Sequence, residues 1–145
     1  MNECVFCINP ETLSSAGVER NRVIKQYTHW WLLLQREDKL RTTKQAAGLL
    51  VAKHHVSEVS QVSPEAAAEL VATVKESAKL LCEKVGSTYT NQETVGFNQG
   101  PEAGQTIMHA HVHVLPVSAE DPAWLKVRAG IGGAFEALRE KRREG

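Results

Sequence analysis

The chain has 145 residues, 42% of them hydrophobic and 23% charged, and its 17 Lys and Arg residues balance 17 Asp and Glu residues. This composition is typical of a single globular domain, and the net charge of zero gives no support to a nucleic-acid or membrane-surface partner. No apolar run reaches the length of a membrane span, and the N-terminus lacks the basic-then-apolar pattern of a signal peptide. We therefore expect a cytoplasmic protein with no membrane partner.

Cys4 and Cys7 form a C-x-x-C motif near the N-terminus. In an intracellular protein this spacing favours metal binding or redox chemistry over a structural disulfide. We expect residues 1–21 to form a small segment that resembles a zinc knuckle. The third cysteine, Cys82, lies within a helical pattern, which predicts a buried thiol.

Two apolar runs and a helix follow. Residues 23–35 predict one or two buried strands, and residues 47–53 predict another. The sequence Ser63-Pro64-Glu65 indicates a helix start, with serine as the N-cap and proline at the first helical position. Apolar residues then recur at helical spacing until Gly86, which fits the end of the helix.

The second half of the chain begins with one or two expected strands in residues 88–98. A Gly-Pro-Glu-Ala-Gly loop then leads into a run of alternating residues over 105–115. A helix is expected over residues 133–144. Strands before and after one long helix predict an α+β fold with a largely antiparallel sheet.

Three histidines, His109, His111 and His113, occupy alternate positions in the run over 105–115. Alternation is the period of a β-strand, whose successive side chains point to opposite faces. We therefore expect the three imidazoles on one face of a strand. The intervening residues from Met108 to Val114 are apolar and should face the core.

Two interpretations of this histidine row remain open on the residues alone. Two histidines at i and i+2 can share a zinc ion, but three span about 13 Å at Cα, too far for one tetrahedral ion. Alternatively, a neutral imidazole is a good nucleophile toward phosphorus, and its neighbours can donate hydrogen bonds to phosphate oxygens. The preceding loop favours an anionic substrate, because its glycines let backbone N–H groups approach closely, and Asn98, Gln105 and Thr106 add polar groups.

The segment 98–116, Asn-Gln-Gly-Pro-Glu-Ala-Gly-Gln-Thr-Ile-Met-His-Ala-His-Val-His-Val-Leu-Pro, closely resembles the signature of the histidine triad (HIT) superfamily. Its Gly-Pro-Glu-Ala-Gly-Gln-Thr run is most similar to the fragile-histidine-triad branch, whose members hydrolyse dinucleoside polyphosphates. The resemblance extends more weakly over most of the chain. It implies a single HIT-like domain over 1–145, with an antiparallel sheet of about five strands, one long and one shorter helix, and a C-terminal extension over 117–145.

The resemblance assigns chemical roles to the histidines. It implies that His111 is the nucleophile, which attacks the α-phosphate and forms a nucleotidyl-histidine. The backbone carbonyl of His109 would orient the His111 imidazole and fix its tautomer. His113 would hydrogen-bond phosphate oxygens.

Six further residues match substrate-binding positions of the superfamily. Gln105 would contact phosphate oxygens, Thr106 the bridging or leaving oxygen, and Asn98 the phosphates or the leaving group. Three others match positions that line the base and ribose pocket: Leu33, Gln35 and Leu49. For the two leucines, ordinary strand core is the competing interpretation.

Some relatives with a C-x-x-C motif complete a zinc site with two histidines. The matching residues are His55 and His109, so the resemblance implies a structural zinc ion held by Cys4, Cys7, His55 and His109. His54 is the alternative ligand if the register differs by one residue, and two reduced cysteines without a metal are the competing interpretation. Family members also usually carry Gly-His just before the strand that matches residues 49–52, whereas the aligned residues here are Ala46-Ala47, so one supporting histidine is absent.

Together, these features predict a nucleotide hydrolase or nucleotidyl transferase that cleaves dinucleoside polyphosphates at the α-phosphate. The family resemblance also implies a homodimer. Magnesium could accompany the substrate, although the sequence shows no carboxylate cluster to hold it. Two alternatives remain: a nucleoside phosphoramidase that uses the same histidines on a P–N bond, and a non-catalytic nucleotide-binding or interaction module. A nucleic-acid deadenylase is disfavoured by the neutral charge.

Overall fold

The structure is a computed structural model that describes residues 5–8, 21–35 and 46–120. The sheet contains β1 (Asn21–Gln26), β2 (Trp30–Gln35), β3 (Gly48–Ala52), β4 (Tyr89–Gly96) and β5 (His111–Ser118). The helical elements are α1 (Val5–Ile8), α3 (Pro64–Val85) and two 3-10 turns, η1 (Val59–Gln61) and η2 (Pro101–Ala103).

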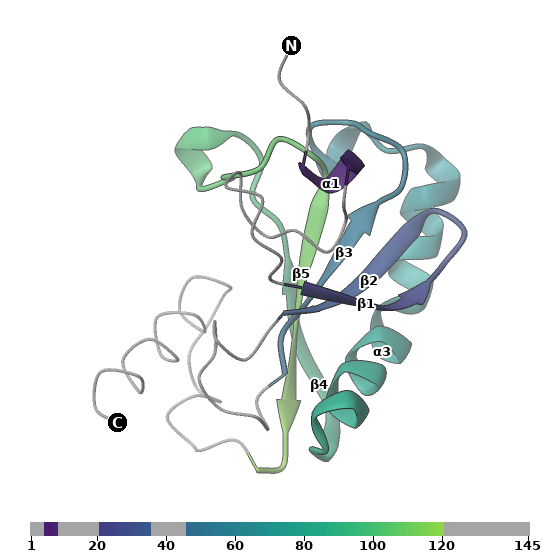
Figure 1. The fold of residues 1–145 in the computed structure, drawn as a ribbon, viewed down its shortest axis with the longest axis vertical. Helices are drawn as coiled ribbons and strands as arrows, with labels where there is room; N and C mark the ends of the chain where they lie inside the picture. Colours follow the sequence, from purple (N-terminus) through teal and green to yellow (C-terminus); the bar gives the residue numbers. More distant parts are fainter. Residues whose placement is uncertain (1–4, 9–20, 36–45, 121–145) are drawn as a thin grey trace.

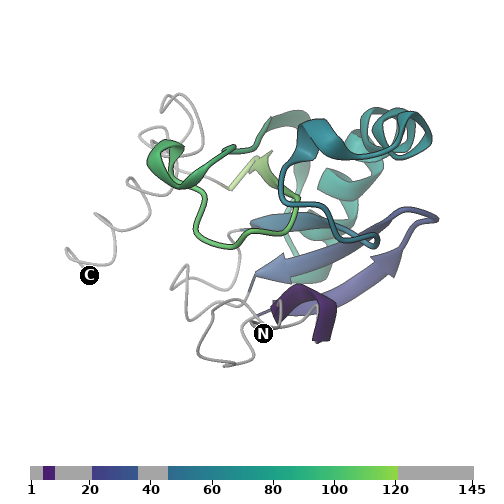
Figure 2. The same ribbon diagram turned by 90° about the horizontal axis from the view of Figure 1, so that it is seen from above.

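The five strands form one sheet in the order β1-β2-β3-β5-β4, and every neighbouring pair is antiparallel. The long helix α3 covers one face of the sheet, and the short helix α1 lies on the opposite side (Figures 1 and 2). This arrangement confirms the predicted α+β fold with a five-stranded antiparallel sheet and one long helix. Within the described residues, the short helical elements are α1 and the two 3-10 turns.

Helix α3 begins and ends where the sequence predicts. The Ser63 hydroxyl accepts a hydrogen bond from the backbone N–H of Ala66, which satisfies one of the N–H groups left free at a helix start. At the other end, Gly86 adopts a left-handed conformation with φ of 74°, which glycine reaches without a steric penalty. Cys82, on the face toward the sheet, is buried as expected.

The main core lies between α3 and the sheet. Its buried apolar residues include Trp30, Leu32, Leu50, Leu81 and Val112. Trp30 is fully buried, and its indole N–H donates a 2.8 Å hydrogen bond to the carbonyl oxygen of Ala66 in the first turns of α3. This pair joins the start of β2 to the start of the helix.

We expect Trp30→Phe to lower the free energy of unfolding by about 2 kcal/mol or more, because it leaves a cavity and removes a buried hydrogen bond. Trp31→Phe is the matched control. Trp31 points to the other face, is only half-buried, and lies beneath the Lys53 ammonium group at 4.8 Å. The control should cost less than about 1 kcal/mol. Urea unfolding followed by circular dichroism measures both values, and equal losses would contradict this description of the core.

The register of the strands assembles a second row of side chains on the face opposite α3. Leu33 pairs with Leu49, which pairs with His113. One step along the strands, Trp31 pairs with Val51, which pairs with His111. Because directly paired residues point to the same face of a sheet, both histidines project beside these apolar side chains.

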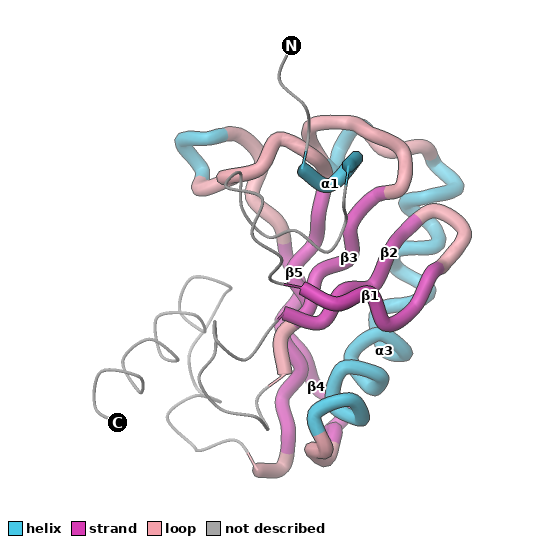
Figure 3. Tube along the Cα trace, in the orientation of Figure 1, coloured by secondary structure: helices cyan, strands magenta, loops and turns pink. Residues whose placement is uncertain are grey.

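The prediction of a continuous histidine strand from residue 105 is wrong in its first half. Strand β5 begins at His111, and His109 lies in the loop between η2 and β5. Figure 3 shows a pink loop leading into the magenta strand β5. The ladder to β3 ends at the Val51–His111 pair, because β3 itself ends at Ala52 and Lys53 N–H bonds to His29. Met108, expected in the core, is accordingly 39% exposed, whereas Ala110, Val112 and Val114 are buried as predicted.

Several sequence predictions fall outside the described residues. They concern Cys4, most of the knuckle-like segment over 1–21, and the helix over 133–144, which belongs to the C-terminal extension. Among the helices that the structure describes, none is long and apolar enough to cross a membrane.

Candidate active site and metal site

His111 is held by its own chain. Its Nδ1 lies 2.6 Å from the backbone carbonyl oxygen of His109. Because a carbonyl oxygen can only accept, Nδ1 must carry a proton, and in the neutral imidazole Nε2 then presents a lone pair. Burial lowers the pKa of His111 below its ordinary value, against the opposing effect of this hydrogen bond. The arrangement thus favours a neutral imidazole whose Nε2 can act as a nucleophile.

His113 lies beside His111 on the same face of β5. The two ring centroids are 5.6 Å apart, with the rings inclined by 72°. On one side, His113 is paired with Leu49 of β3, and on the other with Gly96 of β4, which has no side chain. The two histidines are half-buried, so they form a short polar strip at the edge of an apolar surface.

The apolar surface beside this strip is a second cluster of buried residues: Phe6, Leu33, Leu49 and Val51. Leu33 is fully buried and Leu49 nearly so, and both lie in the row that ends at His113. Gln35 is the next residue of β2 on this face and is also buried. Its Oε1 atom has no hydrogen-bond partner among the residues that the structure describes.

The three polar residues predicted to contact phosphate, Asn98, Gln105 and Thr106, differ from one another in burial. Gln105 is buried, and its side-chain amide bonds only to backbone: Nε2 donates to Ser57 and Ile107 carbonyls, and Oε1 accepts from Gly100 N–H. Its observed bonds therefore hold the loop in shape. Thr106 and Asn98 are exposed, and the Asn98 side chain lies against Gly104, where an added Cβ would be only 2.6 Å from Nδ2.

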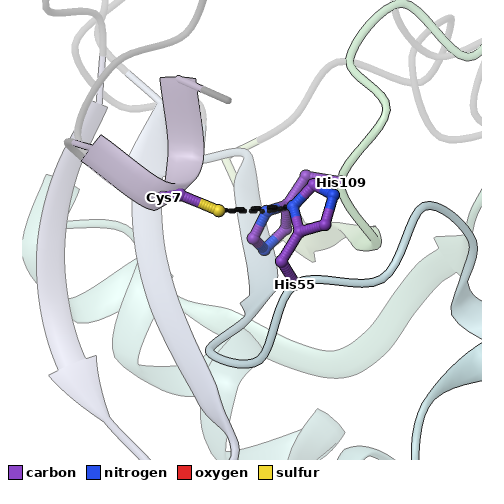
Figure 4. Close-up of side chains that lie close together, drawn as sticks. All are labelled: Cys7, His55 and His109. Atoms are coloured by element: carbon purple, nitrogen blue, oxygen red, sulfur yellow. Dashed lines mark hydrogen bonds between the residues drawn. The ribbon is translucent and has the colours of Figure 1, made fainter. Parts of the chain in front are cut away.

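Three side chains from distant parts of the sequence converge beside this site: Cys7 of α1, His55 after β3, and His109 before β5 (Figure 4). Cys7 Sγ lies 3.2 Å from Nδ1 of His55 and 3.5 Å from Nδ1 of His109. The two Nδ1 atoms are 3.0 Å apart. The fourth predicted ligand, Cys4, lies outside the described residues, and His54 is exposed and not part of the cluster.

These distances fit a tetrahedral zinc ion. Bond lengths of about 2.0 Å to nitrogen and 2.3 Å to sulfur place two nitrogens about 3.3 Å apart, and a nitrogen and a sulfur about 3.5 Å apart. His109 is also in the right tautomer, because its Nε2 lies 2.6 Å from the carbonyl oxygen of Ala52 and so donates a proton there. Burial lowers the pKa of His109, which favours the neutral form that a metal requires.

Cys7, His55 and His109 are the group of three or more potential metal ligands found among the described residues, and the group includes no carboxylate. The structure also shows what occupies the positions where family members usually carry Gly-His. Ala47, at one of the two aligned positions, is fully buried directly before β3, and Ala46 packs against the main core.

The sequence predictions missed one residue that contacts both sites. Phe6 is 3% exposed, and its ring packs edge-to-face against His109 and His111, with centroids 5.7 Å and 5.6 Å away. The signal was available, since Phe6 is an aromatic residue inside the C-x-x-C motif and directly precedes a predicted metal ligand. Its position against His111 could not be inferred without the fold.

Solved structures with the same fold include a HIT family hydrolase from Clostridium thermocellum, with a TM-score of 0.54 and 22% identity over 84% of this chain and 96% of that one. A hypothetical histidine triad nucleotide-binding protein from Sulfolobus tokodaii gives a TM-score of 0.58 and 21% identity, over 97% of this chain and 88% of that one. A zinc-bound histidine triad family protein from Mycobacterium smegmatis gives a TM-score of 0.56 and 21% identity, over 98% of this chain and 97% of that one.

Residues 27–120 match the HIT domain family. The matched range contains β2, β3, β5 and the helix that covers them, together with His111 and His113. It spans well over half of the sequence, and the similar structures share the fold over most of their length. The chain therefore belongs to the HIT domain family.

Proposed function

We propose that this protein is a nucleotide hydrolase or nucleotidyl transferase that cleaves dinucleoside polyphosphates at the α-phosphate through a covalent nucleotidyl-His111 intermediate. The observation that carries the proposal is the 2.6 Å contact between His111 Nδ1 and the His109 carbonyl oxygen. This bond fixes the imidazole with its Nε2 lone pair available, which a nucleophilic histidine needs. The preference for dinucleoside polyphosphates rests on the Gly-Pro-Glu-Ala-Gly-Gln-Thr run before the histidines.

In the proposed reaction, His111 Nε2 attacks the α-phosphorus. The N–P bond forms as the bond from phosphorus to the bridging oxygen breaks, and the electron pair leaves with the rest of the polyphosphate. Water then attacks the same phosphorus and gives up a proton to the solvent, while the N–P bond breaks and its electron pair returns to Nε2. A nucleoside monophosphate is released with His111 restored. His113 hydrogen-bonds the non-bridging oxygens, where negative charge is concentrated in each step.

The apolar cluster beside the histidines suits the nucleoside end of the substrate. Leu33 and Leu49 provide a buried apolar surface in the row that ends at His113. The Gln35 Oε1 atom is a buried acceptor that a ribose hydroxyl could satisfy. Asn98, Gln105 and Thr106 remain predicted phosphate contacts.

We further propose that Cys4, Cys7, His55 and His109 hold a structural zinc ion. Such an ion would join the N-terminal segment to the strand that carries the nucleophile, and it would leave His111 and His113 for chemistry. The supporting observation is the convergence of three of these ligands with spacing suited to a tetrahedron. The similar structure from Mycobacterium smegmatis is described as zinc-bound.

We also propose that the 145 residues form one domain, located in the cytoplasm, and that two copies associate as a homodimer. Strand β4 is the last strand of the sheet, and Val95 at its end and Phe97 just beyond it are 38% and 42% exposed. Exposed apolar side chains beside an edge strand favour association with another chain.

Two alternatives differ in a measurable way. A nucleoside phosphoramidase would use the same histidines on a P–N bond, and a binding module would retain nucleotide without turnover. We expect diadenosine polyphosphates to be hydrolysed with a higher kcat/KM than adenosine phosphoramidate, and mass spectrometry of acid-quenched protein to detect adenylylated His111. Preference for the phosphoramidate would support the first alternative, and binding without turnover of either substrate would support the second.

A further inference from the structure

The short helix α1 joins the proposed metal site to the proposed nucleophile through two consecutive side chains. Cys7 approaches the Nδ1 atoms of His55 and His109 at 3.2 and 3.5 Å. Phe6, the preceding residue, is buried and packs edge-to-face against His109 and His111, with centroids 5.7 Å and 5.6 Å away. These two are the side chains of α1 that the structure describes.

Phe6 completes the surroundings of the His111 imidazole. The ring is held at Nδ1 by the His109 carbonyl, and it has Phe6 and His113 as aromatic neighbours, each at 5.6 Å. A hydrogen bond at one atom fixes a direction but leaves the ring able to tilt about that bond. Packing against Phe6 restricts this tilt, and therefore the direction in which Nε2 points.

A helix of four residues is far too short to be stable by itself, so α1 keeps its place only through tertiary contacts. The Phe6 ring contributes apolar packing against Leu33, Leu49 and Val51. The much stronger attachment available to this turn is a bond from Cys7 to a metal ion that His55 and His109 also hold. A metal ion bound at Cys7 would therefore couple its own binding to the placement of Phe6.

We propose that α1 is a metal-dependent positioning segment, in which the ion bound at Cys7 holds Phe6 against His111 and thereby fixes the orientation of the nucleophile. Phe6 is then a positioning residue that acts through His111. This proposal rests on the proposed zinc site. It depends on the proposed function only where it calls His111 the nucleophile. It extends the metal's role from holding the fold to preparing the active site.

The test follows the ring signals of His111 by NMR at constant pH in protein labelled with ¹⁵N-histidine, with the signals identified by their loss in His111→Asn. Spectra are recorded for the zinc-loaded protein and after chelation, in the wild type and in Phe6→Ala. We expect chelation to displace the His111 signals in the wild type. In Phe6→Ala the signals should already be displaced with zinc bound, and the further response to chelation should fall at least about twofold.

Comparing the wild type with Phe6→Ala distinguishes an effect of the metal that acts through Phe6 from one that acts directly through His109. His109 is both a metal ligand and the residue whose carbonyl holds His111, so chelation could act without Phe6. A chelation response that persists in full in Phe6→Ala would overturn the proposal, as would wild-type signals that do not move. Loss of all dispersed amide signals on chelation would also overturn it, because the metal would then hold the whole domain.

Matched variants control for a merely structural role. Val71→Ala removes an exposed apolar side chain of α3 and should leave both the His111 signals and their response to chelation unchanged. Phe6→Leu keeps the apolar volume but removes the ring, and it replaces Phe6→Ala if the latter does not fold. With zinc content unchanged, Phe6→Ala should lower kcat about tenfold. The NMR result stands whether or not the protein hydrolyses nucleotides, so failure of this inference is distinguishable from failure of the proposed function.

Discussion

His111→Asn is expected to lower kcat for diadenosine polyphosphate hydrolysis by about 10,000-fold, because the variant has no nucleophile with which to form the covalent intermediate. Asparagine keeps a neutral polar side chain of similar reach, and its amide N–H can still donate to the His109 carbonyl that accepts from His111 Nδ1. Nucleotide affinity, measured by isothermal titration calorimetry, should therefore change by less than about threefold. The adenylylated protein should disappear from the mass spectrum.

The neighbouring histidine supplies the control. His113 lies on the same face of β5, and its ring centroid is 5.6 Å from that of His111, but it is proposed to hydrogen-bond phosphate oxygens without forming a bond to phosphorus. His113→Asn should therefore lower kcat by about 100-fold and retain a detectable covalent intermediate. If the two variants lose activity equally and His111→Asn still becomes adenylylated, the nucleophile is another residue and the proposed assignment is wrong.

The fold was largely predictable because its signals are local. Proline after an N-cap serine determined where α3 begins, and alternation correctly placed Val112 and Val114 in the core. The same rule failed at His109, which lies before β5. Whether a strand continues depends on its neighbour, and β3 ends at Ala52, whose carbonyl oxygen accepts from His109 instead. Alternation along one segment of the sequence does not show how long the neighbouring strand, here β3, will be.

The candidate site was less accessible from the residues alone. Cys7, His55 and His109 are separated by 48 and 54 positions, and their convergence was predicted only through the resemblance to a known family. The placement of Phe6 against His111 was not predicted by either route, since it depends on how α1 docks on the sheet. Gln105 shows another limit: the residues alone did not predict that its side-chain amide bonds to the backbone of its own loop and of Ser57, and its phosphate contact stays a prediction.

His55→Ala is expected to reduce bound zinc from about one equivalent to below about 0.2 and to lower the thermal midpoint by about 10 °C, because a structural metal contributes folding free energy directly. The imidazole of His55 is one of the three ligands that the structure brings together, with Nδ1 3.2 Å from Cys7 Sγ and 3.0 Å from His109 Nδ1. Removing it leaves an incomplete set of donors around the ion. Elemental analysis of protein purified without added metal measures the zinc content, and calorimetry measures the midpoint.

The adjacent residue provides an unusually close control, since His54 is also exposed, also a histidine and part of the same loop, but lies outside the cluster. His54→Ala should retain a full equivalent of zinc and change stability by less than about 0.5 kcal/mol. If instead His54→Ala loses the metal and His55→Ala retains it, the register of this loop differs by one residue, and His54 is the ligand. If both variants and the wild type contain less than about 0.2 equivalents, the cluster is a hydrogen-bonded group of one thiol and two imidazoles, and no zinc ion holds α1.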